Sequence, residues 1–548
     1  MKKFTIKYKV GNKIITTTET SNSFFDLEII DTPDRFRVLL NPKKTFELVD
    51  FYAEMPFCFK KGDKFFGAGY QSWTVTREYT CDDIMRSTIK LANIHKKLKH
   101  IASMTSDERF VEYSEKPGEF HSHGYTYVRN GEKMWLCGSL CEKTGFSYLK
   151  VKMKEDYFSF RKDVLGKFVT EPYLVFDFVF FTGTYDEVFD KYFSLFDMPE
   201  TRNGAMSGYT SWYNYFQNIN EEIILRDLNG LDRAKEDVSI FQIDDGYETF
   251  VGDWLDPNPS RFPHGMKYIA DKIHEKGYKA GIWLAPFSAQ KISRIAKEHP
   301  DWLVKDDKGK PLQGVLAWGG AYILDFYNDE VKEYLRKVFD TVINEWGFDM
   351  VKLDFLYSEC LYPRNGKCRG EIMRESLEFL REIVGDKLFL GCGVPMSSCF
   401  GLVDACRISC DVDLTYKGKI YNFLQVSNEI LSAQHAINNS IFRRHLNGRV
   451  FMNDPDVFFL RNNNLKFTDE QKLLLAKINN LCGNVLFVSD NAGDFDSVQM
   501  ERLRKFFRKT DEKVLSAEYT DKENIEIVTL LDGEKKTFSF NIKKGTVN

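Results

Sequence analysis

The stretch NDEVKEYLRKVFDTVINEWGFDMVKLDFLY, residues 328–357, contains one helix pattern followed by one strand pattern. In residues 328–346 apolar side chains recur every three or four positions, which predicts an amphipathic helix packed on a core. Residues 349–357 form a short apolar run that is typical of a strand in a parallel sheet. The stretch is therefore one helix-and-strand unit of an α/β fold.

Similar units repeat on both sides of this stretch. After residue 208, short apolar strands alternate with helical patterns, as expected for parallel βα units. The expected strands are residues 209–215, 238–245, 279–287, 321–326, 349–357, 387–395, 406–413 and 449–456. Eight such units in succession predict a (β/α)8 TIM barrel. Because other domains flank this barrel, the expected fold class is multidomain α/β.

The flanking regions have a different rhythm. Residues 1–195 alternate apolar and polar positions between turn residues, which predicts an N-terminal antiparallel β-sandwich. Residues 484–548 alternate again, beginning with VLFVSD (485–490), and predict a small C-terminal β domain. Because 548 residues exceed what one core holds, we expect three domains: 1–195, a catalytic barrel over 196–483, and 484–548.

Composition excludes several classes of function. A formal net charge of −4 lacks the basic excess that a nucleic-acid partner requires. No apolar run is long enough to span a membrane, and the start, MKKFTIKYKV, alternates like a strand rather than a signal peptide. Eleven cysteines without a CxxC pair favour reduced thiols. We therefore expect a cytoplasmic protein with no nucleic-acid or membrane partner.

Polar and aromatic residues gather at the C-terminal ends of the expected barrel strands, which is where barrel active sites lie. They are Trp212, Tyr213, Asp244, Asp245, Trp283, Asp325, Asp354, Cys392, Asp411, Asp413, Asp454 and Asp456. Helix capping by Asp would explain one or two of them. For most of a ring, convergence on one pocket is the better hypothesis.

The residue types in this ring favour sugar chemistry. Only nine histidines occur, few near strand ends, and no GxGxxG, GxxxxGK[ST] or GxSxG motif is present, so we expect no metal and no cofactor. Carboxylates accept hydrogen bonds from vicinal hydroxyls, and aromatic rings stack on the apolar face of a pyranose. Two further carboxylates, about 5 to 5.5 Å apart, could perform retaining glycoside hydrolysis. Asp354 and Asp411 are the candidates.

Lys352 and Asp354 stand two positions apart in an apolar strand. They share one side of the strand, which inside a barrel faces the lumen. A lysine beside a carboxylate favours the ionised form that a nucleophile needs. A buried ion pair that fixes the strand register would explain the same two residues equally well.

Six motifs carry a resemblance to a known family. They are IDDGYE (243–248), GIWLAPF (281–287), KLDFLY (352–357), GCGVP (391–395), RISCD (407–411) and NDPD (453–456). In this order and spacing they resemble the α-galactosidases of glycoside hydrolase family 36. GYQSW (69–73) and SWYNY (211–215) extend the similarity over most of the chain.

The resemblance implies the roles of individual residues. Asp354 would be the nucleophile and Asp411 the acid/base. The other implied substrate-binding residues are Asp244 and Asp245 for the galactose O4 and O6 hydroxyls, Lys352 and Arg407 for ring hydroxyls, Cys392 and Gly393 beside the sugar, Trp212, Tyr213 and Trp283 as walls, and Trp73 reaching in from the sandwich.

Some positions stay open. Tyr247 stands where family members more often have Trp, and Asp413 lies on the same face as Asp411, although the Arg-x-x-x-Asp spacing favours Asp411. Asp253, Asp404 and Asp454 are expected to be supporting or capping residues. Trp254, Trp302 and Trp318 would line the outer pocket or belong to the core.

The implied function is that of a retaining, exo-acting α-galactosidase acting on small α-galactosides. An α-N-acetylgalactosaminidase or a raffinose-type synthase that transfers galactosyl groups would use the same fold and intermediate. A non-catalytic galactoside-binding protein is a third hypothesis. Because Trp73 crosses between domains, subunit contacts could also shape the site, and a homo-oligomer is one expected form.

Overall fold

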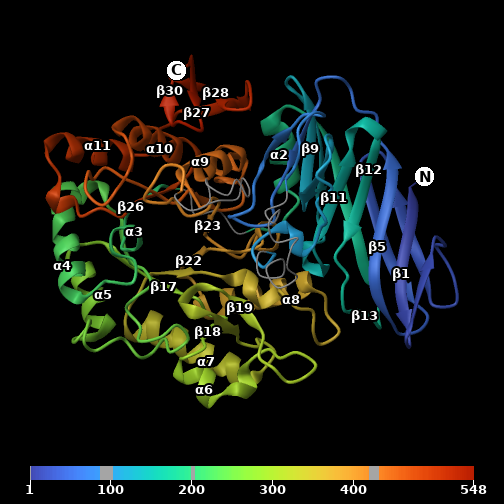
Figure 1. The fold of residues 1–548 in the computed structure, drawn as a ribbon, viewed down its shortest axis with the longest axis horizontal. Helices are drawn as coiled ribbons and strands as arrows, with labels where there is room; N and C mark the ends of the chain where they lie inside the picture. Colours follow the sequence, from blue (N-terminus) through green and yellow to red (C-terminus); the bar gives the residue numbers. More distant parts are fainter. Residues whose placement is uncertain (1, 87–102, 199–203, 419–430) are drawn as a thin grey trace.

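The computed structural model describes residues 2–86, 103–198, 204–418 and 431–548. Figure 1 shows antiparallel sheets at the N-terminal end, a parallel sheet surrounded by helices in the middle, and a small antiparallel sheet at the C-terminal end. The sequence pattern also suggests a helix near residues 84–98, most of which lie outside the described residues. The fold class expected from the sequence, with a sandwich, a barrel and a small β unit, is confirmed.

The N-terminal region consists of two antiparallel sheets. The first has the order β2 (Lys13–Thr17), β1 (Lys3–Val10), β5 (Phe46–Pro56), β12 (Tyr157–Lys162), β11 (Ser147–Lys152) and β8 (Glu119–His123), with β13 (Lys167–Val169) also on β5. The second has the order β3 (Phe25–Asp31), β4 (Arg35–Pro42), β14 (Tyr173–Gly183), β10 (Lys133–Ser139), β9 (Tyr125–Asn130), β6 (Lys64–Gly67) and β7 (Arg77–Tyr79). Alternate residues of β1 are buried, so the predicted period of two fills the core between the sheets.

The central sheet is entirely parallel. Its order is β24 (Met452–Asp454), β23 (Ala405–Arg407), β22 (Leu388–Gly391), β21 (Met350–Leu353), β17 (Lys279–Leu284), β16 (Ile240–Ile243), β15 (Met206–Thr210), β26 (Val485–Val488) and β25 (Val457–Phe458). The strands β24 and β26 also contact each other, so the sheet curls into a barrel. Both faces are covered, which explains why the strand sequences are continuous apolar runs.

Helices surround this sheet. They are α4 (Glu221–Gly230), α5 (Gly265–Glu275), α7 (Asp329–Asp340), α8 (Arg369–Val384), α9 (Ala433–Phe442), α10 (Asp469–Cys482) and α11 (Ser497–Phe507). The helix expected from residue 328 begins where predicted, because the Asn328 side chain accepts a hydrogen bond from the Glu330 N–H. Val331, Leu335 and Val338 are buried on one face. A π-helical turn, Thr341–Glu345, continues the helix, and Gly347, with a φ of 84°, lies just beyond that turn.

The strand expected at residues 321–326 is not part of the barrel. β20 (Ala321–Ile323) lies in a separate antiparallel sheet between β18 (Ser288–Gln290) and β19 (Gln313–Val315), while β17 pairs directly with β21. The turn at residues 316–320 explains this difference. It is too short for the crossover that parallel neighbours require, so β19 and β20 form a hairpin.

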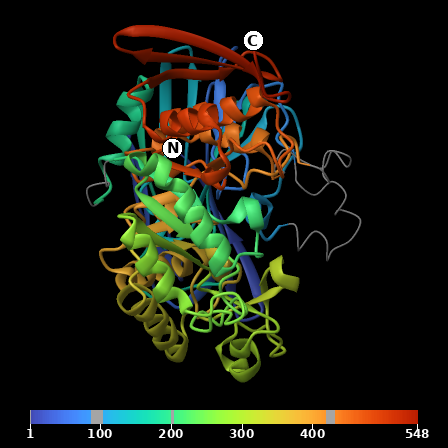
Figure 2. The same cartoon turned by 90° about the vertical axis from the view of Figure 1, so that its left-hand side faces the viewer.

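The stretch VLFV (485–488) also differs from expectation. It does not join the C-terminal sheet but forms β26, whose register pairs Met206 with Val485 in the central sheet. The C-terminal sheet contains β27 (Lys513–Tyr519), β28 (Asn524–Leu531), β29 (Glu534–Asn541) and β30 (Thr546–Val547). It contacts α10, and Figure 2 shows it at the top of the molecule, near the C-terminus. The division into domains at residues 195 and 483 stays a prediction.

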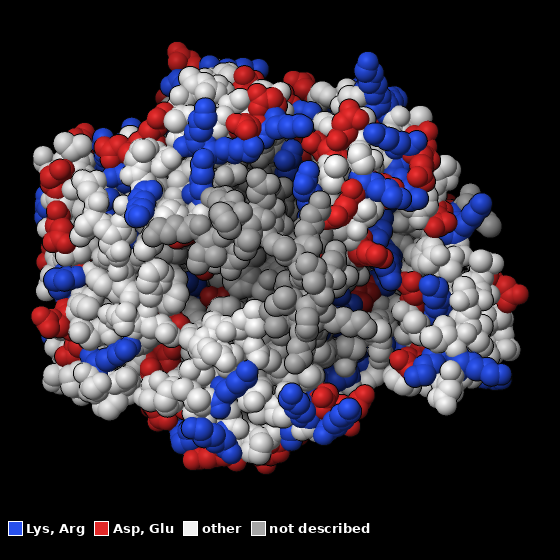
Figure 3. Space-filling view, in the orientation of Figure 1, with Lys and Arg blue, Asp and Glu red and all other residues white. Residues whose placement is uncertain are grey.

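The surface carries mixed charge. In Figure 3, Lys and Arg side chains lie among Asp and Glu side chains around the outline of the visible face. Within the described ranges, none of the helices has the length and apolar character needed to cross a lipid bilayer.

Candidate active site

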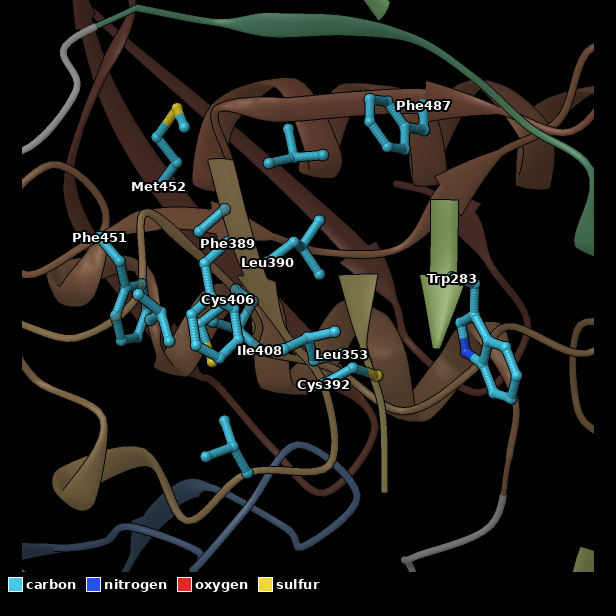
Figure 4. Packing of buried hydrophobic residues seen from close by; sticks show 14 of the residues in the cluster. Trp283, Leu353, Phe389, Leu390, Cys392, Cys406, Ile408, Phe451, Met452 and Phe487 are labelled. Carbon is cyan, nitrogen blue, oxygen red and sulfur yellow. The ribbon is translucent and has the colours of Figure 1, made fainter. Parts of the chain in front are cut away.

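The predicted site residues lie where the central strands end. Trp283 is the next-to-last residue of β17, Asp354 follows β21, Cys392 follows β22, and Arg407 ends β23. Because the strands are parallel, these ends meet at one rim of the barrel. Figure 4 shows Trp283, Leu353, Cys392 and Ile408 among the buried side chains behind this rim.

Lys352 is buried, and its ion pair differs from the one the sequence suggested. The Lys352 Nζ donates to Asp244 Oδ2 at 2.8 Å rather than to Asp354. Burial, the largest single influence, would lower the pKa of Lys352, but the surrounding negative charges, first Asp244 and then Asp354, together raise it. Lys352 is thus held as a cation by the carboxylate that follows β16, which is separated from β21 by β17.

The Asp354 carboxylate accepts two hydrogen bonds from neutral groups. Trp283 Nε1 donates to Oδ2 at 3.2 Å, and the Phe355 backbone N–H donates to Oδ1 at 2.7 Å. Phe355 has a φ of 53°, an uncommon conformation for a bulky residue. It turns the chain sharply after β21, so the carboxylate is fixed where the strand ends.

Gly393 accommodates this turn. Its φ is 56°, and a Cβ added there would stand 3.3 Å from the Phe355 Cα and N atoms. Its carbonyl accepts from the Tyr357 N–H at 2.8 Å. The neighbouring Cys392 is buried, which raises the pKa of its thiol, so it acts as a neutral, compact wall.

The two acids after β16 have different surroundings. Asp244 Oδ2 accepts from Gln242 Nε2 at 2.8 Å as well as from Lys352. Asp245 accepts from Gln217 Nε2 at 3.1 Å and from Trp318 Nε1 at 2.8 Å.

Asp245 also has an acidic neighbour. Its carboxyl is hydrogen-bonded to that of Glu248, and burial raises the pKa of both, that of Glu248 well above its usual range. Two such carboxyls must share a proton, because a bond between two carboxylates has no donor. The higher pKa puts this proton on Glu248 and leaves Asp245 as an acceptor.

Arg407 binds three carboxylates. Its Nη1 lies 2.9 Å from Asp411 Oδ1, its Nε 3.2 Å from Asp454 Oδ2, and its Nη2 2.8 Å from Asp456 Oδ1. The Asp411 side chain keeps 35% of its surface exposed, whereas the side chains of Asp454 and Asp456 are buried. Of the three, Asp411 is therefore the one that solvent or a ligand can reach.

The pKa of Asp411 is raised. Withdrawal from solvent is the main cause, and the negative charge of Asp354 adds to it, while Arg407 and Lys352 oppose it. Asp413 has a different environment, since its carboxylate accepts from the Leu414 N–H at 2.6 Å and the Thr415 hydroxyl at 3.2 Å. Asp413 thus stabilises its own loop.

Tyr213 and Asp456 form a pair that the sequence did not reveal. The Tyr213 hydroxyl donates to Asp456 Oδ2, which also accepts from the Val412 N–H at 2.8 Å. Burial raises the pKa of Asp456 to about 7, although Arg407 opposes the shift. Tyr213 and its neighbour Trp212 lie on a short helix, α3 (Trp212–Tyr215), because β15 ends at Thr210 rather than at residue 215.

Trp73 reaches the barrel from the N-terminal region, as predicted. Its ring centroid lies 5.8 Å from that of Phe355 and 5.7 Å from that of Tyr357. Trp318 contacts Phe355 from another side at 5.1 Å. Trp254, by contrast, is a core residue that packs edge-on against Trp283 at 5.8 Å.

Three contributors were missed or left undecided by sequence reasoning. Asp456 was placed in the ring of strand-end residues without a role, Glu248 was quoted only as part of a motif, and Trp318 was not distinguished from core residues. The NDPD motif contained a usable signal, because Asp454 and Asp456 are two apart at a strand end. No local signal identifies Trp318, which reaches Asp245 from the inserted antiparallel sheet.

Comparison with known proteins gives a consistent result. Residues 210–370 match the family model for Melibiase. A blood-group A galactosaminidase from Flavonifractor plautii is 30% identical over 196 residues, which are 32% of this chain and 18% of that protein. Alpha-galactosidase 1 from Pediococcus pentosaceus is 28% identical over 183 residues, 30% of this chain and 24% of that protein. The matches therefore span less than a quarter of these curated relatives.

Solved structures match over nearly the whole chain. The α-galactosidase TtGalA from Thermus thermophilus, in complex with p-nitrophenyl α-D-galactopyranoside, has a TM-score of 0.71 at 23% identity and covers 97% of this chain and 98% of its own. The family 36 enzyme AgaA from Geobacillus stearothermophilus has a TM-score of 0.62 at 10% identity, covering 98% and 81%. The chain thus matches the Melibiase family model over residues 210–370 and has the fold of these α-galactosidase structures.

Proposed function

We propose that this chain is a retaining, exo-acting α-galactosidase that releases terminal α-linked galactose from small galactosides. The observation that carries the proposal is the different environment of two carboxyl groups at one rim. Asp354 accepts hydrogen bonds from Trp283 and its own loop, while the pKa of Asp411 is raised. A nucleophile must be ionised and an acid must hold a proton, so these environments suit different roles.

In this mechanism Asp354 attacks the anomeric carbon while Asp411 protonates the leaving-group oxygen. A covalent galactosyl-enzyme forms on Asp354, and the aglycone departs as an alcohol. Asp411, now ionised, takes a proton from water, which attacks the anomeric carbon and releases galactose with its original configuration. Arg407 donates a hydrogen bond to the Asp411 carboxyl at 2.9 Å. Arg407 therefore stabilises the ionised form of Asp411 between the two steps.

The remaining polar groups suit recognition of galactose hydroxyls. Asp244 and Asp245 are both buried acceptors held by fixed donors, with Lys352 and Trp318 among them. Carboxylates anchored in this way bind hydroxyls without reorganising. The side walls of the proposed sugar site are aromatic and consist of Trp73, Trp212, Tyr213 and Trp283. Next to the sugar, the site is lined by the compact residues Cys392 and Gly393. Arg407 adds hydrogen-bond donors for the sugar hydroxyls.

The direct test is the Asp354→Gly variant. It should lose turnover of aryl α-galactosides, and added azide should restore part of it by yielding β-galactosyl azide, because azide enters from the face that the carboxylate occupied. The matched control is Asp413→Asn, which removes a loop-stabilising carboxylate and should retain turnover. Full activity of Asp354→Gly would refute the assignment of the nucleophile, and loss of activity in the control would reopen the choice of acid.

Substrate choice is settled by a panel. The expected order is rapid hydrolysis of aryl α-galactosides and little hydrolysis of the corresponding α-N-acetylgalactosaminides. Sucrose added during turnover should not capture the galactosyl group. Preferential cleavage of the N-acetylated substrate, or formation of a trisaccharide, would favour the galactosaminidase or synthase alternatives, and binding of galactose without turnover would favour a sensor.

We further propose that the protein works in the cytoplasm. All eleven cysteines lie within the described residues and carry free thiols, which suits a reducing compartment. Trapping the thiols during cell lysis and counting them by mass spectrometry should give eleven alkylated cysteines.

A further inference from the structure

Arg443 lies between the barrel and the loop that carries Trp73. It follows the last residue of α9, and only 1% of its surface is exposed. In Figure 1, α9 is the barrel helix beside the N-terminal sheets, and it contacts β7, the strand that follows this loop. A fully buried guanidinium is costly unless its donors are satisfied, so its partners indicate what it does.

Four of the partners are backbone carbonyls of one loop, residues 69–74. Arg443 Nη2 donates to the carbonyls of Gly69 at 3.3 Å, Gln71 at 2.7 Å and Thr74 at 3.0 Å, and Nη1 donates to the carbonyl of Ser72 at 3.0 Å. The guanidinium therefore gathers the loop's carbonyls around a single planar group.

Asn439, one helical turn earlier on α9, completes this arrangement. Its Nδ2 donates to the carbonyls of Ser72 and Thr74, both at 3.0 Å, and its Oδ1 accepts from the Thr76 N–H at 3.0 Å. Ser72 and Thr74 are the residues on either side of Trp73. The backbone that bears the indole is thus held on both sides by α9, with the ring against Phe355.

The same guanidinium also reaches the other half of the site. Arg443 Nη1 donates to the Ile408 carbonyl at 2.6 Å. Ile408 directly follows Arg407 and stands three residues before Asp411. One nitrogen therefore links the backbone at Trp73 to the backbone that bears the proposed acid/base.

We propose that Arg443, supported by Asn439, is a positioning residue that fixes Trp73 over the sugar site and couples it to the strand end carrying Asp411. The inference rests on the proposed function for its catalytic consequence, but its structural content stands alone. Lysine cannot replace the arginine, because a single ammonium group cannot reach five carbonyls spread along a planar fork. The carbonyls left behind would be buried without donors.

The catalytic test is a double-mutant cycle. Arg443→Lys should lower kcat/KM about 10- to 100-fold, as expected when a remote change misplaces a binding group. In a Trp73→Ala background the same substitution should cost less than about threefold, because its target is already gone. Equal losses in both backgrounds would overturn the proposal. Asn439→Ala provides a second variant should Arg443→Lys not fold, and its loss should also shrink in the Trp73→Ala background.

The matched control is Arg449→Lys. Arg449 belongs to the same segment of the barrel and also bonds the N-terminal region, through Asp186 at 2.7 Å and Asp190 at 2.6 Å, but it does not contact the 69–76 loop. It should lower thermal stability while leaving kcat and KM nearly unchanged. A loss of kcat/KM equal to that of Arg443→Lys would show that any weakened domain contact suffices and would overturn the specific role.

Hydrogen exchange gives a readout that does not depend on activity. Amides of residues 69–76 should exchange faster in Arg443→Lys than in the wild type or in Arg449→Lys, and the Asn439→Ala variant should show the same direction. If the amides of this segment exchange at an unchanged rate, the proposed positioning role of Arg443 is overturned, whatever kcat and KM the variant has. If the wild-type protein hydrolyses no α-galactoside, the proposed function fails while the exchange experiment still decides this inference.

Discussion

Asp456 and the proposed acid/base Asp411 share one guanidinium, and this arrangement yields a signed prediction. Arg407 bonds Asp411 through Nη1 at 2.9 Å and Asp456 through Nη2 at 2.8 Å. Asp456→Asn removes one negative charge yet keeps a carbonyl oxygen for the Val412 N–H and the Tyr213 hydroxyl. Arg407 then interacts with fewer carboxylates, and the ionised form of Asp411 becomes more favourable. The pKa of Asp411 should fall.

The size of the shift follows from the geometry. Two carboxylates on neighbouring nitrogens of one guanidinium lie roughly 6 to 8 Å apart. At about 7 Å and an effective dielectric constant of about 20, two like charges repel by about 2.4 kcal/mol, or about 1.7 pKa units. Because the pKa of Asp456 is itself about 7, it carries only about half a charge at neutral pH. The expected fall is therefore about one pH unit.

The assay is the pH dependence of kcat/KM. Its alkaline limb reports loss of the acid's proton in the free enzyme, so this limb should move about one unit toward lower pH in Asp456→Asn. An alkyl or disaccharide α-galactoside is the substrate of choice, because a nitrophenyl group leaves with little help from an acid. A limb that stays in place or moves toward higher pH would refute the reasoning.

A control separates this effect from a general change in charge. Asp349→Asn removes the same charge at the opposite end of β21, where Asp349 bonds His274 at 2.8 Å and Lys387 at 3.1 Å. It should leave the alkaline limb unmoved, since distance and solvent screen the interaction with Asp411.

Three further predictions concern binding and stability. Lys352→Met should lower the free energy of unfolding in urea by about 3 to 5 kcal/mol, because it leaves Asp244 buried without its cation, and adding Asp244→Asn should recover stability but not activity. Gly393→Ala should cost about 1 to 2 kcal/mol, since its φ is 56° and the new Cβ would stand 3.3 Å from backbone atoms; thermal unfolding measures it, and an unchanged midpoint would contradict it. Trp318→Phe removes the 2.8 Å donor to Asp245 and should raise KM about tenfold or more, whereas an unchanged KM would mean that Asp245 does not bind substrate.

The fold was predictable wherever burial leaves a period in the sequence. The helix from residue 328 and the alternating strand β1 were identified because their buried faces repeat at 3.6 and 2 residues. The two strands assigned to the wrong sheet, at residues 321–323 and 485–488, are apolar runs of three and four residues. Runs this short do not indicate which strand they pair with. A sequence pattern therefore cannot distinguish a hairpin strand, a barrel strand and a strand of the C-terminal sheet.

The site was predictable as a location but not as a network. Strand ends of a barrel converge whatever their sequence, so Asp354, Cys392 and Arg407 could be placed together. Which donor meets which acceptor depends on neighbours across strands. The hydrogen bond from Tyr213 to Asp456 joins residues 243 positions apart. The sequence around either residue does not predict it.

The partner of Lys352 illustrates why that distinction matters for the chemistry. Local spacing suggested that Lys352 pairs with Asp354, yet Lys352 is bonded to Asp244. Within the described residues, the hydrogen-bond donors to the Asp354 carboxylate are the Trp283 indole and a backbone N–H, both neutral. A cation bonded directly to the nucleophile would stabilise the free carboxylate more than the covalent ester, in which its charge has disappeared, and would raise the barrier to attack. Neutral donors fix the direction of the carboxylate with less of that penalty. The lysine instead forms its ion pair with Asp244, the proposed acceptor for sugar hydroxyls, and so compensates the burial of that carboxylate.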